Sequence, residues 1–297
     1  MNRLGKIIPY LGRTGVGKIL ITSIMKHYDA GFCTTEAIAN QAKPDECAEN
    51  GDVFKFSVAI PHYNRGASIS RPLRNLLNHP GVGEVVIVDD GSSEEEWGFA
   101  QREVEKIPHD GKIRMHRRRE NLGALRTKLE CAERSQFPWV LILDSDNTAF
   151  TNYLDALTAL KEPRENTIYC ASWAFPFFPF HELGYHALTF DRVGELTRNG
   201  LLRRVYIIND GNYLVPRNEY VRNVAAVVQD RNHAADVMLV NYRWLSTGGR
   251  IQILPSTSYL HRIEGSSFWE NTKELSKSEA LRLFDKFEAG EKWHPEP

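Results

Sequence analysis

Apolar residues in the first half of the chain gather in short, uninterrupted runs that end in polar residues. Three runs share this pattern: "FSVAIP" at 56–61, "EVVIVDD" at 84–90 and "WVLILDSD" at 139–146. Valine, isoleucine and leucine without alternation are typical of strands buried on both faces of a parallel sheet. Segments of helical length lie around these runs, at 68–78, 94–107 and 123–135. The alternation predicts βαβ units and therefore an α/β fold, with a mainly parallel central sheet flanked by helices.

The second half of the chain is less regular, but its pattern predicts further strands and helices. The expected strands are "NTIYCASWAF" at 166–175, "VYIINDGNYLVP" at 205–216, which enters a loop, and "RIQILPS" at 250–256. The expected helices lie at 233–249, closed by Gly248, and at 276–290. The last segment begins at a serine, repeats apolar residues with a 3.6-residue period and ends at a glycine, which is typical of a surface helix.

Composition and cysteine usage are those of an ordinary globular protein. The chain has 297 residues and a formal net charge of -1. Its isoelectric point near 6.8 gives no electrostatic case for nucleic acid as a partner. The four cysteines lack metal-ligand spacing, which favours reduced thiols and a cytoplasmic protein. No apolar stretch approaches the roughly 20 residues that span a bilayer.

Residues 1–52 differ from the rest of the chain, and we expect a helical extension followed by a linker. The stretch "GRTGVGK" at 12–18 matches the phosphate-binding loop G-x-x-x-x-G-K. However, Ile19 stands where Ser or Thr is needed, and Pro9 disfavours the required preceding strand. We therefore expect nucleotide binding elsewhere. The basic and apolar residues of this extension fit either packing on the main domain or peripheral contact with the cytoplasmic membrane face.

Polar side chains stand at the end of each apolar run in the first half. The first run ends in Pro61 and is followed by the polar residues His62, Tyr63 and Asn64. The second ends in Asp89 and Asp90, and the third in Asp144, Ser145 and Asp146. In open α/β sheets, ligands bind outside the carboxyl ends of the strands. Each aspartate pair alone could cap a helix or lie in a solvated turn. Two pairs at one edge repel each other unless a cation neutralises them, so together they predict a bound metal or a cationic ligand.

The order of these segments resembles glycosyltransferase family 2, whose members have the GT-A fold. The resemblance is carried by "SVAIPHYNRG", "EVVIVDDGSS", "ENLGALRTK", "WVLILDSDN", "ADVMLVNYRWLSTGGRIQILP" and "YLHR", from Phe56 to Arg262. It implies an inverting enzyme that uses a nucleotide-sugar, with a UDP-sugar favoured over a GDP-sugar, and Mn²⁺ or Mg²⁺ on the diphosphate. The acceptor would be a glycan, a glycolipid or another hydroxyl compound. The expected catalytic domain covers 53–272, with a donor half at 53–150, an acceptor half at 151–272 and a C-terminal helix and tail at 273–297.

The resemblance also implies the residues that bind the nucleotide. Asp90 corresponds to the carboxylate that binds the uracil edge, and Tyr63 to a residue that packs on the base. Arg126 could reach the base or diphosphate, or could be a solvated helix arginine. The full donor set is Pro61, Tyr63, Asn64, Asp89, Asp90, Asn121, Arg126, Asp144 and Ser145. The basic run "HRRR" at 116–119 could clamp phosphate, although we favour an exposed strand face.

Asp144-Ser145-Asp146 matches the family's D-x-D motif, and by this resemblance Asp146 is the expected direct metal ligand. His261, in "YLHR", fits the family's late histidine that completes the metal site. A lone histidine in a loop is ordinarily structural, but its position after a late strand favours the metal interpretation. The imidazole favours Mn²⁺ over Mg²⁺.

Asp236 is the expected catalytic base by the same resemblance. The family has an acidic pair at this point, and here Ala235 replaces its first member. A first-turn aspartate stabilised by the helix dipole is the alternative interpretation. Asp210 is a second candidate for the base, and with Asn212 a candidate for acceptor binding. Two other interpretations stay open: a catalytically silent GT-A domain that binds nucleotide-sugar or a partner, and a sugar nucleotidyltransferase, although "IPHYNRGAS" lacks the glycine-rich signature of the latter.

Overall fold

The strands of the protein form one continuous sheet with mixed direction. We describe a computed structural model of residues 53–200, 202–228, 235–262 and 272–294. Within these ranges the strand order is β3-β2-β1-β4-β7-β6-β8-β5. The strands are β1 (Phe56–His62), β2 (Val82–Asp89), β3 (Ile113–Arg117), β4 (Trp139–Ile142), β5 (Thr148–Ala149), β6 (Thr167–Phe175), β7 (Tyr213–Pro216) and β8 (Arg250–Leu260).

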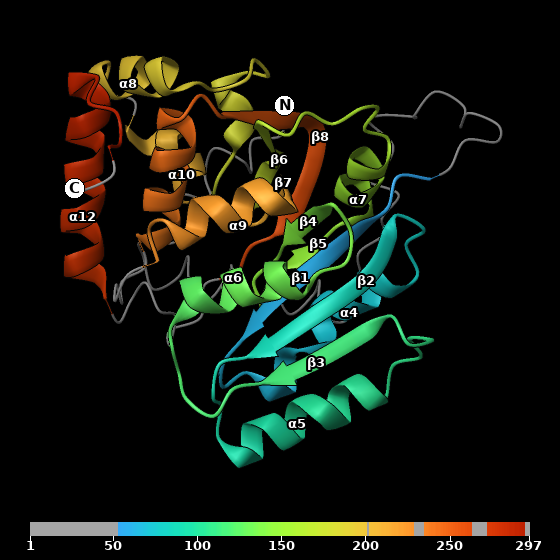
Figure 1. The fold of residues 1–297 in the computed structure, drawn as a ribbon. Helices are drawn as coiled ribbons and strands as arrows, with labels where there is room; N and C mark the ends of the chain where they lie inside the picture. The colour runs from blue at the N-terminus through green and yellow to red at the C-terminus, as the bar shows by residue number, and fades with distance from the viewer. Residues whose placement is uncertain (1–52, 201, 229–234, 263–271, 295–297) are drawn as a thin grey trace, which may run out of the picture.

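Helices flank this sheet on both faces (Figure 1). They are α4 (Ser70–Leu77), α5 (Glu94–Glu105), α6 (Ala124–Arg134), α7 (Thr151–Thr158), α8 (Phe190–Arg198), α9 (Arg217–Ala225), α10 (Asp236–Ser246) and α12 (Lys273–Ala289). Short 3₁₀ helices are η1 (Gly66–Ser68), η2 (Phe180–Leu183) and η3 (Leu202–Asn209). In Figure 1, α6 and α9 lie side by side in front of the sheet, whereas α8, α10 and α12 gather on the side of β6 and β8. None of the helices in the described ranges combines the length and apolar character needed to cross a bilayer.

The apolar runs of the first half form the centre of the sheet, as the sequence predicts. β1 pairs in parallel with β2 and β4, and β2 pairs in parallel with β3. Val58, Val86 and Leu141 are fully buried, because helices cover both faces of these strands. The α/β architecture with flanking helices is therefore confirmed, and one hydrophobic core runs through these strands and on into the second half of the sheet.

The structure corrects one element of the second half. The expected strand at 205–216 is instead the 3₁₀ helix η3, a polar break and the four-residue strand β7. The apolar run "VYII" is too short to distinguish helix from strand by period, and Ile207 and Ile208 are buried at 0% exposure in the helical form. β7 then pairs antiparallel with both β4 and β6. This reversal brings the polar residues before β7 next to the carboxyl end of β4.

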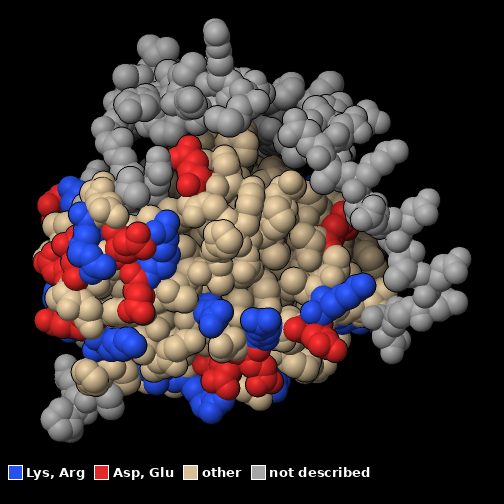
Figure 2. Space-filling model, turned by 90° about the horizontal axis from the view of Figure 1, so that it is seen from above, with Lys and Arg blue, Asp and Glu red and all other residues tan. Residues whose placement is uncertain are grey.

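Charged side chains do not form a single-sign field on the face seen in Figure 2. Lys and Arg side chains lie next to Asp and Glu side chains there, and uncharged residues form the centre of the view. Residues 1–52, with the P-loop-like stretch at 12–18, lie outside the described residues. The expectations made for that extension are therefore not addressed by the fold.

Candidate active site

Residues from both halves of the chain meet at one end of the sheet. β1, β2 and β4 are parallel, so the polar residues after each of them share an edge. β6 runs parallel to β8, and both run in the direction of β4 because β7 is antiparallel to β4 and to β6. His261 follows β8, and Asn212 directly precedes β7. The sheet topology therefore brings the predicted donor, metal and acceptor residues to the same edge.

Asn212 joins two of the predicted carboxylates. Its Nδ2 donates to Asp144 Oδ2 at 3.2 Å and to Asp210 Oδ1 at 3.1 Å. Its Oδ1 accepts from the Asp144 backbone N–H at 2.9 Å. Tyr259 extends the network, because its hydroxyl lies 2.8 Å from Asp210 Oδ1 and 3.4 Å from His261 Nδ1. One hydrogen-bonded chain thus connects Asp144, Asn212, Asp210, Tyr259 and His261.

Lys128 on α6 supplies a buried positive charge to this network. Its Nζ lies 2.9 Å from Asp144 Oδ1. Burial acts to lower the pKa of Lys128, but Asp144 and Asp236 outweigh it and the pKa is raised. Burial conversely acts to raise the pKa of Asp144, but Lys128 outweighs it and the pKa is lowered. Both groups therefore stay charged at neutral pH. Lys128 thus interacts electrostatically both with Asp144 of the D-x-D motif and with Asp236.

Asp146 has a different cationic partner. Arg65, which follows β1, donates to Asp146 Oδ2. The backbone carbonyl of Asp146 accepts from Arg262 Nη1 at 2.6 Å. Asn147 Oδ1 accepts from the Arg262 backbone N–H at 2.9 Å. The segment after β4 is thus attached to the segment after β8, which fixes the carboxylate of Asp146 beside the site.

His261 is held in an aromatic environment. Its backbone N–H donates to the Phe175 carbonyl at 2.7 Å. The rings of Phe177, Phe178 and Tyr259 pack edge-on against its imidazole. Burial lowers the pKa of His261, while Asp210 and Asp144 act in the opposite direction without reversing the shift. The imidazole is therefore neutral at pH 7, which is the form that binds a metal.

The two candidate bases differ in their surroundings. Asp236 begins α10, is 5% exposed, and accepts a hydrogen bond from the Val237 backbone N–H at 2.6 Å. Asp210 is 6% exposed, and its Oδ2 is buried without a hydrogen-bond partner among the described residues. Burial raises the pKa of Asp210 despite hydrogen bonds from Asn212 and Tyr259. A carboxylate with a raised pKa is better suited to proton abstraction than one with an ordinary value.

Asp90 organises the turn that the sequence associates with the nucleotide. Its carboxylate accepts from the backbone N–H groups of Leu122 and Gly123, both at 2.9 Å, and from Arg118 Nη1 at 3.0 Å. Asn121, in the same turn, accepts from the Gly123 N–H at 3.1 Å. A carboxylate offers about four lone-pair positions, so these three donors leave room for one more.

The neighbouring residues divide into buried and exposed groups. Asp89 is fully buried and accepts from His62 Nδ1 at 2.8 Å. Burial acts to raise the pKa of Asp89, but His62 and Ser92 outweigh it and the pKa is lowered. Asn64 Oδ1 accepts a hydrogen bond from the Ser93 backbone N–H at 3.0 Å. The Tyr63 side chain is 44% exposed. Of the other predicted donor residues, Pro61 is half-buried in β1, Ser145 is buried, and Arg126 is exposed on α6.

The sequence analysis gave no role to two basic residues of the site, Arg65 and Lys128, and it favoured the wrong environment for a third, Arg118. Arg118 was expected on an exposed strand face, but it lies beyond the end of β3 with a side chain only 13% exposed. It bonds Asp90 and Glu130, so the expectation of an exposed face is wrong for this residue. Lys128 gave a usable signal, because it follows Leu125 by three positions and so lies on the buried face of its helix.

The side chains predicted to bind the metal, Asp146 and His261, are of a chemical type that suits a divalent metal. Carboxylate oxygens and a neutral imidazole are ligands for Mn²⁺, and the Arg65 guanidinium shows that Asp146 accepts a cation at this position. Among the described residues, however, no three acidic, histidine or cysteine side chains converge as a metal cage. The predicted ligands Asp146 and His261 therefore do not form such a cage with a third protein side chain among the described residues.

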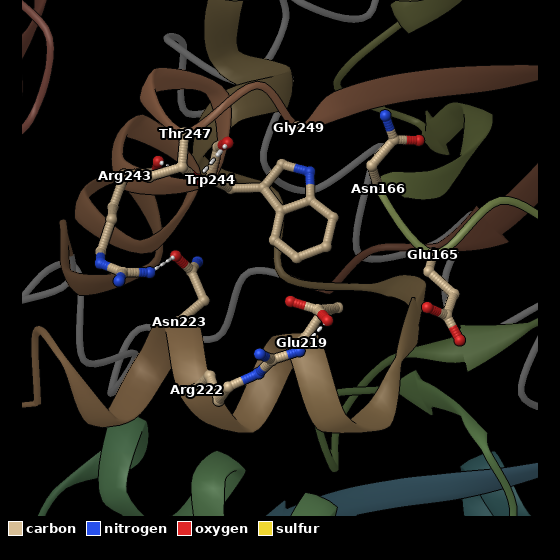
Figure 3. Close-up of a pocket in the computed structure, with 9 residues that line it drawn as sticks. All are labelled: Glu165, Asn166, Glu219, Arg222, Asn223, Arg243, Trp244, Thr247 and Gly249. Atoms are coloured by element: carbon tan, nitrogen blue, oxygen red, sulfur yellow. Dashed lines mark hydrogen bonds and ion pairs between the residues drawn. The ribbon is translucent and has the colours of Figure 1, made fainter.

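A separate cavity of about 460 Å³ lies at the other end of the sheet, near the starts of β6 and β8. Its walls come from the loop before β6, from α9 and from the end of α10 (Figure 3). They are formed by Glu165, Asn166, Glu219, Arg222, Asn223, Arg243, Trp244, Thr247 and Gly249. Figure 3 shows Arg243 bonded to Asn223 and Arg222 bonded to Glu219. None of the predicted site residues lines this cavity.

Comparison with known sequences gives partial matches to curated proteins. Hyaluronan synthase of Streptococcus pyogenes is 32% identical over 127 residues, which cover 40% of this chain and 29% of that protein. The uncharacterized protein MT1568 of Mycobacterium tuberculosis is 34% identical over 104 residues, which cover 35% of this chain and 31% of that protein. The matched segments therefore span less than a third of these relatives.

Comparison with solved structures gives the fold. The chain is similar to residues 1–349 of S. aureus TarS in complex with UDP-GlcNAc, with a TM-score of 0.58, 19% identity, and coverage of 80% of this chain and 69% of that chain. The TarS complex with UDP gives a TM-score of 0.57 at 18% identity, covering 80% of this chain and 68% of that one. The protein therefore has the GT-A fold. Because the model of the family "Glycosyl transferase family 2" matches residues 57–223, more than half of its length, the chain belongs to glycosyl transferase family 2.

Proposed function

We propose that the protein is a metal-dependent, inverting glycosyltransferase that moves a sugar from a UDP-sugar to a hydroxyl group of an acceptor. The observation that carries the proposal is the network of Asp144, Asn212, Asp210, Tyr259 and His261 at the carboxyl edge of the sheet. The TarS structures that resemble this chain contain UDP and UDP-GlcNAc, which supports uracil as the donor's base.

The donor's nucleotide would bind beside β1 and β2. Asp90 would accept the imide N–H of uracil through its remaining lone pair, and the exposed ring of Tyr63 would pack on the base. Asn121 and Asn64 belong to the turns on either side of these residues. Arg118 fixes the Asp90 carboxylate and compensates its charge, so that a neutral imide N–H can be recognised rather than a second cation.

The diphosphate would lie over the D-x-D segment. Asp146 and His261 would hold a divalent metal together with diphosphate oxygens, and the metal when bound supplies Lewis-acid stabilisation of the leaving group. Lys128 holds Asp144 in its ionised form from within the protein. Arg65 would exchange the carboxylate of Asp146 for a phosphate oxygen, since guanidinium groups bind both.

The acceptor hydroxyl would lose its proton to Asp236. Asp236 starts α10, and its charge acts together with that of Asp144 to raise the pKa of Lys128. Asp210 is the alternative base, supported by its raised pKa and by the Oδ2 atom that no described residue uses. With Asn212 it would otherwise orient the acceptor.

A screen of UDP- and GDP-sugars for hydrolysis of the donor tests this function without knowledge of the acceptor. We expect slow release of UDP from one UDP-sugar in Mn²⁺, and none after removal of metal with EDTA. The Asp146→Asn variant should lose this activity, whereas Asp191→Asn, an exposed aspartate in the first turn of α8, should keep it. UDP binding without turnover of any donor in the presence of diverse acceptors would identify a catalytically silent binding module instead.

A further inference from the structure

The segment after β6 presents aromatic rings beside His261 of the candidate site. The backbone N–H groups of Phe177 and Phe178 both donate to the Ala174 carbonyl at 2.9 Å. The Ala174 N–H donates in return to the Phe178 carbonyl at 2.9 Å. These bonds fold the segment back onto the end of β6, so the backbone that carries the rings is fixed there.

The rings form a continuous surface that ends at His261. Phe178 lies 5.5 Å from the His261 ring and 5.7 Å from the Tyr206 ring, measured between centroids. Phe177 lies 6.1 Å from His261. Phe177 and Phe178 are half-buried, whereas Tyr206 is 43% exposed. Large aromatic side chains in the core are covered by neighbours, so an aromatic group with an exposed end next to a polar site is available to a ligand.

The same surface is adjacent to the polar network. His261 contacts Tyr259, whose hydroxyl bonds Asp210, and Asp210 shares Asn212 with Asp144. Asp144, whose side chain is 33% exposed, is the carboxylate of this network that an acceptor on the rings can meet, whereas Asp210 and Asn212 are 6% and 1% exposed. This combination matches a sugar ring, which has C–H groups on its faces and hydroxyl groups around its edge.

We propose that Phe177, Phe178 and Tyr206 form an aromatic wall against which the acceptor stacks, and that the acceptor is a saccharide. The proposal rests on the proposed function, because it assigns the acceptor class for the same site. A lipid chain would need a contiguous exposed apolar surface. Among the described residues, Tyr206 is the member of this wall that counts as a large exposed hydrophobic side chain, and it carries a hydroxyl.

A direct measurement of saccharide binding tests this proposal independently of catalytic activity. The probes are chitotetraose, cellotetraose and maltotetraose at millimolar concentration, with UDP and Mn²⁺ present, detected by saturation-transfer NMR. We expect at least one tetrasaccharide to bind and Tyr206→Ala to weaken its affinity about tenfold, which corresponds to 1.4 kcal/mol. Tyr206→Phe keeps the ring and should retain most of the affinity. Phe177→Ala should weaken binding in the same direction, while UDP affinity stays within a factor of two of wild type in each variant, which excludes unfolding as the cause.

Tyr185→Ala is the matched control. Tyr185 is 47% exposed, and its carbonyl bonds Gln252 near the start of β8, at the opposite end of that strand from His261. Saccharide affinity should not change in this variant. The proposal of an aromatic wall would be wrong if none of the three tetrasaccharides bound, or if Tyr206→Ala and Tyr185→Ala lost saccharide affinity equally. Binding of farnesyl phosphate that Tyr206→Ala abolishes, without saccharide binding, would overturn it in favour of a lipid acceptor. Saccharide binding without hydrolysis of any nucleotide-sugar would instead overturn the proposed function and leave the wall standing.

Discussion

Lys128 and Asp144 form an ion pair within the site, with Lys128 Nζ 2.9 Å from Asp144 Oδ1. Lys128 lies on α6, and Asp144 follows β4. The lysine side chain is 7% exposed and the aspartate side chain is 33% exposed. A charged lysine this deeply buried is retained only when a carboxylate compensates it. The pair therefore fixes the first aspartate of the D-x-D motif before any ligand binds.

Lys128→Met should destabilise the fold and weaken donor binding together. The substitution keeps an unbranched side chain that is one atom shorter, but it leaves Asp144 without its cation. We expect a loss of about 2 to 4 kcal/mol in the free energy of unfolding, because removal of one partner from a buried pair is costly and Asp144 is still partly solvated. Urea unfolding measures the first effect and calorimetry with UDP the second. Lys277→Met removes an exposed partner of Glu274 and should cost less than about 0.5 kcal/mol.

The contribution of the Lys128–Asp144 pair to the free energy of unfolding should be lost at low pH and at high pH. The pKa of Asp144 is lowered, so its stabilising effect is present above the unfolded pKa of about 3.9 and is lost as pH falls through the folded value. The pKa of Lys128 is raised, so its effect is present below the unfolded pKa of about 10.4 and is lost as pH rises through the folded value. The difference in stability between wild type and Lys128→Met should therefore be constant from about pH 5 to 9. A difference that already disappears at pH 6 would contradict the pairing.

The parts of this site that the sequence predicts are those governed by local pattern. Asp90 and Asp144 follow apolar runs whose lack of alternation marks buried parallel strands, and such strands end at a common edge. The Asn212 link is different, because it joins positions 68 residues apart and depends on the reversed direction of β7. The four-residue apolar run "VYII" fits both helical and strand periods, so the sequence predicted a strand where the structure has η3. The antiparallel direction of β7 could not be predicted for the same reason.

UDP should bind more tightly than GDP, and its binding should require Mn²⁺ or Mg²⁺. Asp90 is held by three donors in a geometry that leaves one lone-pair position for the imide N–H of uracil. Tyr63, 44% exposed, is available to stack on the base. Calorimetry with each nucleotide, with metal and with EDTA, measures both preferences. Tyr63→Ala should lower UDP affinity about tenfold, in keeping with the energy of base–aromatic stacking, and Tyr185→Ala should not. Tight GDP binding that persists in EDTA would refute the assignment.

Lys18→Ala should leave nucleotide affinity unchanged. The stretch at 12–18 resembles a phosphate-binding loop but lacks the hydroxyl that such loops place on magnesium, since residue 19 is Ile19. Under the proposed function, the nucleotide binds instead at the edge that carries Asp90 and Asp146. Calorimetry of the full chain with UDP, alongside a circular dichroism spectrum, checks this. A large loss of UDP affinity in a folded Lys18→Ala variant would return the nucleotide to the N-terminal segment.

Asp236→Asn should abolish sugar transfer while leaving UDP and metal affinity nearly intact. The amide is isosteric with the carboxylate and can still accept the Val237 N–H through its oxygen, but it accepts no proton from the acceptor. General-base catalysis typically contributes about 100- to 10,000-fold, and we expect the upper part of that range for an alcohol. Asp146→Asn should differ by weakening metal and donor binding together. Asp191→Asn, which changes a first-turn aspartate on α8, controls for the loss of a helix-end charge.

Asp210→Asn decides between the two candidate bases. The pKa of Asp210 is raised, so if it is the base the transfer rate should rise with pH through a midpoint above the ordinary value of 3.8. In that case Asp210→Asn should remove the pH dependence together with most of the rate, and Asp236→Asn should keep more than about a tenth of it, outside the range expected for loss of a base. If Asp236 is the base, Asp210→Asn should mainly raise the KM of the acceptor, because Asp210 and Asn212 then serve to orient it. A rate–pH profile of both variants, at saturating donor and with the acceptor varied, separates the two assignments.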